Sequence, residues 1–278
     1  MRLRLYHHAD GARVAYRELG AGPPLALLHS GMLSHKEWEP AVEQLAGRFR
    51  VVLPDLPLHG DSEQRPRHPY TLDWFSEVMS SFAAEVLGPR PLMGGHGAGA
   101  EILLHGIEHG RLRPSRLVLM GNRLHASTTG KVRGALQTAA GAGAVPGLDV
   151  LLSYAASAAF RPARGVELSA RGNPAAADLV RHAFADVAGN SSLARSWSKC
   201  ARAWPRGPQR NLLDLYPRLD FPVLLLWADR DRLNPLAPAE EALALLPQGQ
   251  LRVLESTGFL MAYDDPVGLA RELTAFCG

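Results

Sequence analysis

The sequence predicts an α/β fold in which a mostly parallel, doubly wound sheet has a helical lid inserted between its sixth and seventh strands. Short apolar runs bounded by glycine or proline alternate with segments of helical period through residues 1–122, and this alternation resumes over 220–278. Between them, residues 123–219 hold helix-sized patterns. Alternating strands and helices pair in parallel, with right-handed crossovers that place helices on both faces. We therefore expect one core built from 1–122 and 220–278, and a lid formed by 123–219.

The core elements follow from hydrophobic periodicity along the chain. The segment 36–45, for example, spaces its apolar residues at helical intervals, whereas 50–53 is a β-branched run that ends at Pro54. The predicted strands include residues 14–19, 24–29, 50–53, 91–93, 116–120, 222–227 and 250–254. The predicted helices are residues 36–45, 72–87, 98–109, 238–246 and 267–276.

The lid segment is rich in alanine, and its helical patterns cover residues 131–140, 149–159, 174–188 and 193–204. A helical block between two strands of one sheet belongs over the carboxyl edge of that sheet, where open α/β folds bind their ligands. We therefore expect the lid to cover a ligand site.

Composition and charge indicate a globular protein that binds a small molecule. The 278 residues are 46% apolar and 21% charged, with a net charge of +3 and scattered arginines. We therefore expect neither a nucleic-acid nor a membrane partner. Cys200 and Cys277 lie far apart, which favours a reducing compartment. The chain has no apolar leader and no run near the ~20 residues of a membrane span. We expect a cytoplasmic monomer or homodimer with a mainly apolar ligand.

Four motifs indicate where the chemistry of this fold lies. They are Leu-Leu-His-Ser-Gly-Met at 27–32, Asp-Leu-Pro-Leu-His-Gly-Asp-Ser at 55–62, Gly-His-Gly-Ala-Gly at 95–99 and Leu-Leu-Leu-Trp-Ala-Asp-Arg-Asp at 224–231. In their order and spacing they resemble the motifs of the α/β-hydrolase superfamily, over essentially the whole chain. The resemblance implies an oxyanion loop at 27–32, a nucleophile elbow at 95–99 and an acidic residue, Asp231, after a late strand.

The resemblance also implies an oxyanion hole made by the backbone N–H groups of Ala98 and of Gly31 or Met32. Ser30 stands where the family more commonly has glycine, and Leu58 replaces the first glycine of the second motif. Ser30 is the only hydroxyl in 27–32, so it can donate a hydrogen bond to a ligand carbonyl. Because no base lies beside it in the motif, we do not assign it as a nucleophile.

The sequence departs from a serine hydrolase at two of the three catalytic positions. Gly97 stands where the elbow carries its serine, and Phe259 stands where the family has its histidine. No other residue can take the histidine's place after the last strand, because the last histidine in the chain is His182. The triad mechanism needs a hydroxyl, an imidazole and a carboxylate together, so it is excluded at this elbow.

Four residues are expected to line the site. Gly97 either relaxes a strained elbow or makes room for a bulky ligand. Phe259 either packs in the core or forms an apolar wall for an aromatic ligand. His96 is expected to be a packed, hydrogen-bonded neighbour. His125, just past the sixth strand, is a candidate to face the pocket.

Asp231 is the triad member that remains, and two interpretations stay open. It either caps its loop or a helix, or it acts in catalysis. With the imidazole gone, a carboxylate beside Phe259 would be poorly solvated, which would raise its pKa toward the range useful for proton transfer. It would then act directly or through a water in the space at Gly97.

We expect no cofactor and no metal. The glycines at 94–99 lack the lysine of a phosphate-binding loop. His105 and His109 have the i, i+4 spacing of metal ligands, but the sequence offers no third ligand, and such a pair is usually a solvated helix face.

Three functions are compatible with these features. The first is an atypical, cofactor-independent enzyme that uses the oxyanion hole and Asp231 for acid/base chemistry on a carbonyl compound, as a lyase, isomerase, cyclase or C–C bond-forming enzyme of natural-product biosynthesis. The second is a non-catalytic binding or scaffold protein, because residues 97–100 resemble the elbow of the N-myc downstream-regulated pseudoenzymes. The third, a hydrolase with a relocated triad, is disfavoured by the lack of a late histidine.

Overall fold

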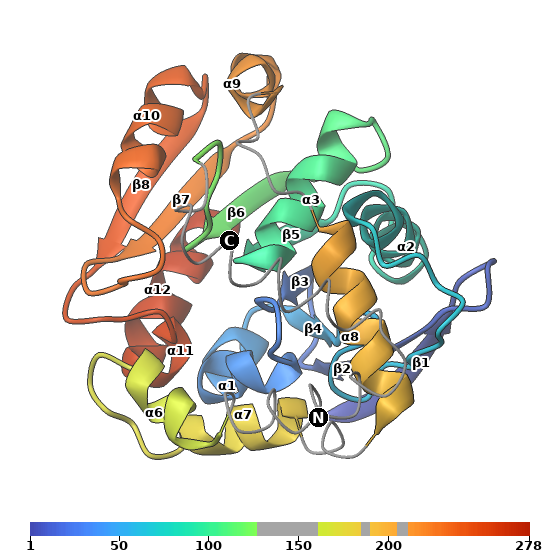
Figure 1. Cartoon of the computed structure of the whole chain (residues 1–278). Helices are drawn as coiled ribbons and strands as arrows, with labels where there is room; N and C mark the ends of the chain where they lie inside the picture. The colour runs from blue at the N-terminus through green and yellow to red at the C-terminus, as the bar shows by residue number, and fades with distance from the viewer. Residues whose placement is uncertain (127–160, 185–189, 205–210) are drawn as a thin grey trace.

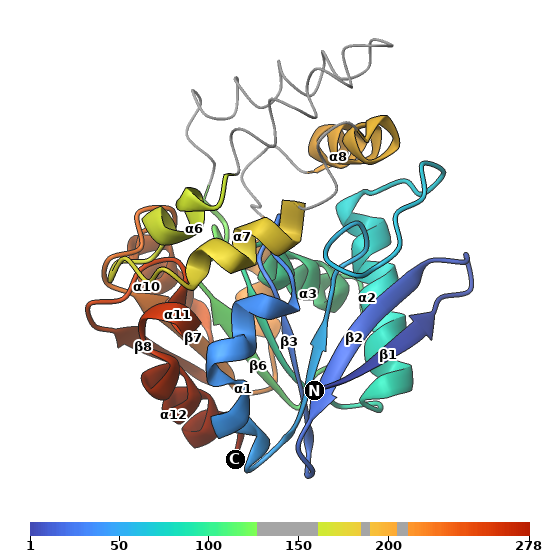
Figure 2. The same cartoon turned by 90° about the horizontal axis from the view of Figure 1, so that it is seen from below.

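The computed structural model describes residues 1–126, 161–184, 190–204 and 211–278, and it has an eight-stranded sheet with helices on both faces (Figures 1 and 2). The strands are β1 (Arg2–His7), β2 (Arg13–Leu19), β3 (Pro24–Leu28), β4 (Arg50–Pro54), β5 (Leu92–His96), β6 (Arg116–Met120), β7 (Val223–Ala228) and β8 (Gly249–Leu254). The predicted α/β fold is confirmed.

The order of the strands brings the motif loops together. The strand order in the sheet is β1-β2-β4-β3-β5-β6-β7-β8. Strand β2 is antiparallel to both of its neighbours, β1 and β4. The strands β4, β3, β5, β6, β7 and β8 are parallel to one another. Strand β5 is central, and its end aligns Gly95 with Leu28 of β3 and His96 with Met120 of β6. The oxyanion loop after β3 and the elbow after β5 therefore start side by side at the carboxyl edge of the sheet.

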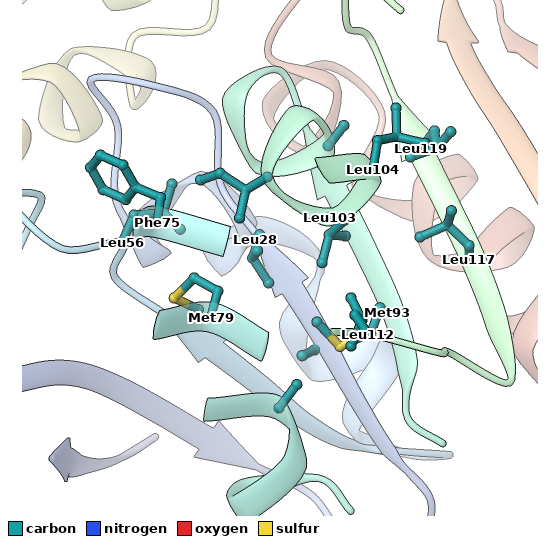
Figure 3. Close-up of a cluster of buried hydrophobic side chains, with 14 of the residues drawn as sticks. Leu28, Leu56, Phe75, Met79, Met93, Leu103, Leu104, Leu112, Leu117 and Leu119 are labelled. Atoms are coloured by element: carbon teal, nitrogen blue, oxygen red, sulfur yellow. The ribbon is translucent and has the colours of Figure 1, made fainter. Parts of the chain in front are cut away.

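Helices cover the two faces of the sheet because the parallel strands are apolar on both sides. The core helices are η1 (His35–Trp38), α1 (Glu39–Ala46), α2 (Leu72–Val86), α3 (Ala98–Glu108), α10 (Ala237–Leu245), α11 (Met261–Asp264) and α12 (Pro266–Cys277). Alternate residues of β6 point to opposite faces, so Leu117 and Leu119 pack with α2 and α3 while Val118 and Met120 pack with α1 and α12. Figure 3 shows the first of these two cores, built around Leu28 and Met93.

The lid lies between β6 and β7, as predicted. Its described elements are helices: α6 (Ala163–Leu168), α7 (Ala176–Phe184), α8 (Ser191–Ala203), α9 (Asn211–Leu215) and the 3₁₀ helix η2 (Tyr216–Arg218). Figure 2 shows α6, α7 and α8 along one edge of the sheet. The patterns at 174–188 and 193–204 correspond to α7 and α8. The patterns at 131–140 and 149–159 lie outside the described residues.

Strand β1 was not predicted from the sequence. It pairs with β2 alone at the edge of the sheet, and its Leu3 and Leu5 side chains are exposed. An edge strand held by backbone pairing on one side needs no buried apolar run, so it gives a weak sequence signal. Cys200 and Cys277 are both buried and form no disulfide with each other. None of the described helices is long and apolar enough to cross a membrane.

Candidate active site

The elbow at Gly97 makes the tight turn from β5 into α3. Gly97 has φ +51° and ψ −116°, a conformation that L side chains rarely adopt, and its N–H approaches the carbonyls of Met120 (3.3 Å) and Gly121 (3.2 Å). A Cβ on Gly99 would lie 2.6 Å from the Leu28 carbonyl oxygen, and one on Gly95 would lie 2.6 Å from a backbone nitrogen. The glycines of the motif are therefore required by the turn itself.

The side chain of Ser30 occupies the space in which a side chain on residue 97 would begin. A Cβ built on Gly97 would lie 2.2 Å from the Ser30 Oγ and 3.0 Å from its Cβ. Contacts below 3.0 Å are essentially never seen for real Cβ atoms. Ser30 is itself buried. Gly97 thus leaves no free room for a bulky ligand at this point, because the oxyanion loop already fills it.

Two of the residues expected to form the oxyanion hole, Gly31 and Ala98, are neighbours in the structure. A Cβ on Gly31 would lie 3.3 Å from the Cβ of Ala98, so the two loops are in contact. Ala98 is the first residue of α3, and the first N–H groups of a helix have no partner within it. Met32 has φ +68° and packs with Val180 of α7 and Trp197 of α8. The candidate hole therefore lies at the junction of the core and the lid.

Glu37 is a site residue that the sequence analysis missed. Its carboxylate is buried and accepts the Ser30 N–H at Oε2 (2.7 Å), while Oε1 forms a short hydrogen bond with Nδ1 of His96. One carboxylate thus joins the oxyanion loop to the elbow. The sequence gives no signal for this contact, because Glu37 lies within a helical pattern and 59 positions from His96.

The ring of His96 packs against that of Phe259, the residue that stands where the family has its histidine. The two rings are 4.5 Å apart between centroids, and the His96 Nε2 is buried with no hydrogen-bond partner among the described residues. Phe259 is half-buried and packs against an apolar cluster that includes residues of α7. Phe259 is therefore part of a core cluster and also packs against the elbow, and its role as a wall for an aromatic ligand stays a prediction.

Asp231 is held by its own loop. Its Oδ1 accepts the N–H groups of Leu233 (2.7 Å) and Asn234 (3.2 Å), and its Oδ2 accepts the Asn234 side-chain amide (2.8 Å). Asp231 is only half-buried. The expectation of a poorly solvated carboxylate in apolar surroundings is therefore wrong, because three N–H groups donate to it and part of the residue is exposed. These contacts are those of a loop-capping aspartate.

His125 lies against the core helices rather than at the elbow. Its Nε2 pairs with Glu241 of α10 (2.8 Å), and its ring is 6.0 Å from that of Tyr216 in η2. Among the described residues, no hydrogen bond, ion pair or ring contact joins His125 to the oxyanion loop or to the elbow. It is therefore a poor candidate for a pocket residue.

Two other histidines near the oxyanion loop are fixed in the neutral form. His29 donates from Nδ1 to the Ser30 carbonyl (2.7 Å) and accepts the Leu56 N–H at Nε2 (2.9 Å). Burial lowers the pKa of His29 to about 3 and that of His59 to about 4. The His59 ring lies 4.7 Å from that of Trp197 in the lid. Both nitrogens of His29 are engaged, so this imidazole is not a base for Ser30.

Two groups of side chains within the described residues have the spacing of metal ligands. One consists of Asp73, His105 and His109, and the other of His35, Asp61 and His182. In the first, α2 supplies the third ligand that the sequence could not show. However, Asp73 is exposed and already binds Arg111 (2.7 Å) and His105 (3.3 Å). The second group lies between core and lid.

Known protein sequences are similar to this chain over all or part of its length. An uncharacterised protein of Mycobacterium tuberculosis is 25% identical over 270 residues, covering 94% of this chain and 77% of that protein. A pimeloyl-[acyl-carrier protein] methyl ester esterase of Aeromonas hydrophila is 36% identical over 72 residues, covering 26% of this chain and 28% of the esterase.

Solved structures share the fold. An alpha/beta hydrolase fold protein from Burkholderia ambifaria matches with a TM-score of 0.80 and 23% identity, covering 98% of this chain and 97% of that one. An esterase from Thermogutta terrifontis matches with a TM-score of 0.77 and 18% identity, covering 100% and 98%. The alpha/beta hydrolase family model matches residues 25–272. The chain therefore belongs to the alpha/beta hydrolase family.

Proposed function

We propose that this member of the family binds an apolar small molecule non-covalently, through a carbonyl or carboxylate oxygen held by the N–H groups of Ala98 and of Gly31 or Met32. The observation that carries the proposal is that the elbow turn is kept while its nucleophile is missing. The tight turn at Gly97 places Ala98 at the start of α3, where its N–H has no partner within the helix, while Ser30 fills the space of the missing nucleophile. Such a site would offer donors to an anionic or polarised oxygen, and the described residues place no activated nucleophile beside them.

Hydrolysis through an acyl-enzyme is disfavoured, although several relatives are named as esterases. A relocated triad would need a base for Ser30, and the nearest candidate, His29, uses both ring nitrogens in backbone hydrogen bonds. His96 is engaged at Nδ1 by Glu37. A hydroxyl without a base is a weak nucleophile.

An apolar ligand fits the surroundings of the candidate hole. Met32 packs in a cluster with Val180, Leu193 and Trp197 of the lid, and Phe259 packs in a second cluster beside α7. Small-molecule sites are mainly apolar, with a few polar groups that fix orientation. Here those groups are the backbone N–H donors.

A proline at residue 98 tests the proposal without removing a side-chain contact. Ala98→Pro deletes the N–H at the first position of α3, where proline is tolerated. Octanoate and 2-octanone serve as probes, and tryptophan fluorescence measures their binding. We expect both to bind the wild type, and Ala98→Pro to weaken octanoate about tenfold or more, because a hydrogen bond to a charged group contributes about 1.5–3 kcal/mol.

Ser191→Pro is the matched control, since it places proline at the first position of α8 instead. Its affinity for octanoate should equal that of the wild type. The proposal is overturned if the wild type binds neither probe at millimolar concentration, or if Ala98→Pro binds octanoate as tightly as the wild type does.

A second candidate function is proton transfer next to a carbonyl, as in a cofactor-independent lyase, isomerase, cyclase or C–C bond-forming enzyme of natural-product biosynthesis. One observation favours it. The Asp231 Oδ2 and the unpartnered His96 Nε2 lie 3.1 and 2.9 Å from one point, the position of a Cβ on Gly121. The two groups form no direct hydrogen bond, so a proton would pass between them through a water or substrate atom lying at that point.

This second function predicts that the protein accelerates deuterium exchange at the α-carbons of 2-octanone in D2O. Asp231→Asn should abolish that exchange and leave octanoate affinity unchanged. Exchange at the buffer rate in the wild type would leave binding alone as the function, and exchange that survives in Asp231→Asn would exclude this role for Asp231.

A further inference from the structure

We propose that His35, Asp61 and His182 form a divalent-cation site, best matched to Zn²⁺, that links lid helix α7 to the core beside the oxyanion loop. The three residues come from separate parts of the chain. His35 begins η1, Asp61 lies in the loop between β4 and α2, and His182 lies in α7. This site is independent of the function proposed above.

The three ligand atoms converge on one point. They lie within 4.8 Å of one another, and the His182 Nε2 is 3.9 Å from Oδ1 of Asp61. The rings of His35 and His182 meet edge to face at 5.4 Å. Two imidazoles and a carboxylate are a common zinc donor set, and three protein ligands leave a fourth position for water.

Asp55 contacts two of the three proposed ligands and holds them in place. Its carboxylate is fully buried and accepts the backbone N–H of His35 (2.6 Å), lies 2.9 Å from the Nδ1 of the same ring, and accepts the Asp61 N–H (2.9 Å). The Arg17 Nη1 also lies 3.1 Å from this Nδ1. Because a guanidinium can only donate, the Nε2 lone pair is free for a metal when Nδ1 donates to Asp55 and does not accept from Arg17. One buried carboxylate thus positions two of the three ligands.

His182 supplies an unused ligand atom. Its Nε2 is buried and has no hydrogen-bond partner among the described residues. Leaving a buried polar atom without a partner is unfavourable, and a bound cation would satisfy it. Two residues before it, Val180 packs against Met32 of the oxyanion loop. The ligand atom therefore lies on the part of the lid that already touches the core.

The surrounding charges leave room for a cation. The Arg17 Nη2 binds the Asp61 Oδ2 (2.5 Å) and leaves Oδ1, the oxygen that faces His182. Glu39 lies 3.7 Å from the His35 Nε2. The carboxylates of Asp55, Asp61 and Glu39 outnumber the nearby cations, Arg17 and Lys36.

Binding should draw α7 toward the core. Ligand atoms of a tetrahedral zinc ion lie roughly 3.3 Å apart, given metal–ligand distances near 2.0–2.1 Å. The present separations of up to 4.8 Å must therefore shrink. In the cluster of Asp73, His105 and His109 the aspartate is likewise exposed and paired with an arginine, but among the described contacts no buried carboxylate positions its ligands as Asp55 does. This cluster serves as the internal control.

The test is calorimetric titration of chelator-treated full-length protein with ZnCl2, with Co²⁺ absorption as a second signal for the ligand set. We expect one Zn²⁺ per chain. His182→Ala and Asp61→Asn should each weaken binding at least tenfold and remove the Co²⁺ spectrum, while His109→Ala changes neither. Zn²⁺ should raise the unfolding temperature of the wild type and not that of His182→Ala.

Circular dichroism reports whether each variant is folded. Asp61→Asn and His182→Ala alter partly exposed side chains, so both are expected to fold. The proposal is overturned if the wild type binds no Zn²⁺ at 100-fold molar excess. It is equally overturned if binding persists in His182→Ala, or if His109→Ala abolishes it, which would assign the metal to the surface cluster.

Discussion

The contact between Ser30 and the missing side chain of Gly97 predicts a coupling that a double-mutant cycle can measure. In Gly97→Ala, the new Cβ would lie 2.2 Å from the Ser30 Oγ. Rotating the hydroxyl away relieves only part of the clash, because the Ser30 Cβ would still be 3.0 Å distant. Overpacking of this kind costs about 1–3 kcal/mol.

The backbone adds a separate cost, because φ at Gly97 is +51°. A non-glycine residue in such a conformation costs about 1–3 kcal/mol. Gly97→Ala should therefore lower the free energy of unfolding by about 2–6 kcal/mol. In the Ser30→Gly background the clash disappears, so the cost should fall to the backbone part alone, a coupling of about 1–3 kcal/mol.

Urea unfolding of the four proteins in the cycle gives the coupling. Gly110→Ala is the matched control, since Gly110 has φ +68° but nothing within 4 Å of its Cβ position, so it reports the backbone cost without a clash. An equal cost of Gly97→Ala in both backgrounds, within about 0.5 kcal/mol, would refute the packing of Ser30 in the elbow.

Two further predictions concern the same region. Glu37→Ala leaves the Ser30 N–H and the His96 Nδ1 buried without their acceptor, so urea unfolding should show a loss of about 3–5 kcal/mol, and less for Glu37→Gln; a loss below 1 kcal/mol would contradict the bridge. Because His29 and His59 are neutral when folded, with pKa values of about 3 and 4, their contribution to stability is complete above pH 6.5 and is lost as the pH falls toward 4. Each histidine should lower the free energy of unfolding by about 1.4 kcal/mol per pH unit below 6.5. His59→Gln should roughly halve the slope of that free energy against pH, and an unchanged slope would show that His59 is not buried in the neutral form.

The fold was predictable because periodicity records burial. The strand β6 was placed at its observed bounds, since a parallel strand buried on both faces is an unbroken apolar run. The lid was predicted because residues 123–219 hold helical patterns and no such apolar run. Strand β1 escaped because its pairing with β2 depends on backbone hydrogen bonds and leaves Leu3 and Leu5 exposed.

The site was predictable only where the motifs are local in sequence. The elbow and the oxyanion loop were found, because tight turns need glycines at fixed spacing. Ser30 fills the elbow, and Glu37 links Ser30 to His96. Both are contacts between residues distant in the sequence, which no local pattern records. Asp231 was given a poorly solvated environment because the sequence does not show that Asn234 folds back to solvate it.

The most direct test of the central claim is whether the elbow forms a covalent adduct. The protein is incubated with an alkyl fluorophosphonate, alongside an active serine esterase as a positive control, and its intact mass is measured. With glycine at residue 97 and no base for Ser30, the mass should stay unchanged while the esterase is fully labelled. A stoichiometric adduct, mapped by peptide analysis to Ser30 or to another serine of the site, would contradict the account.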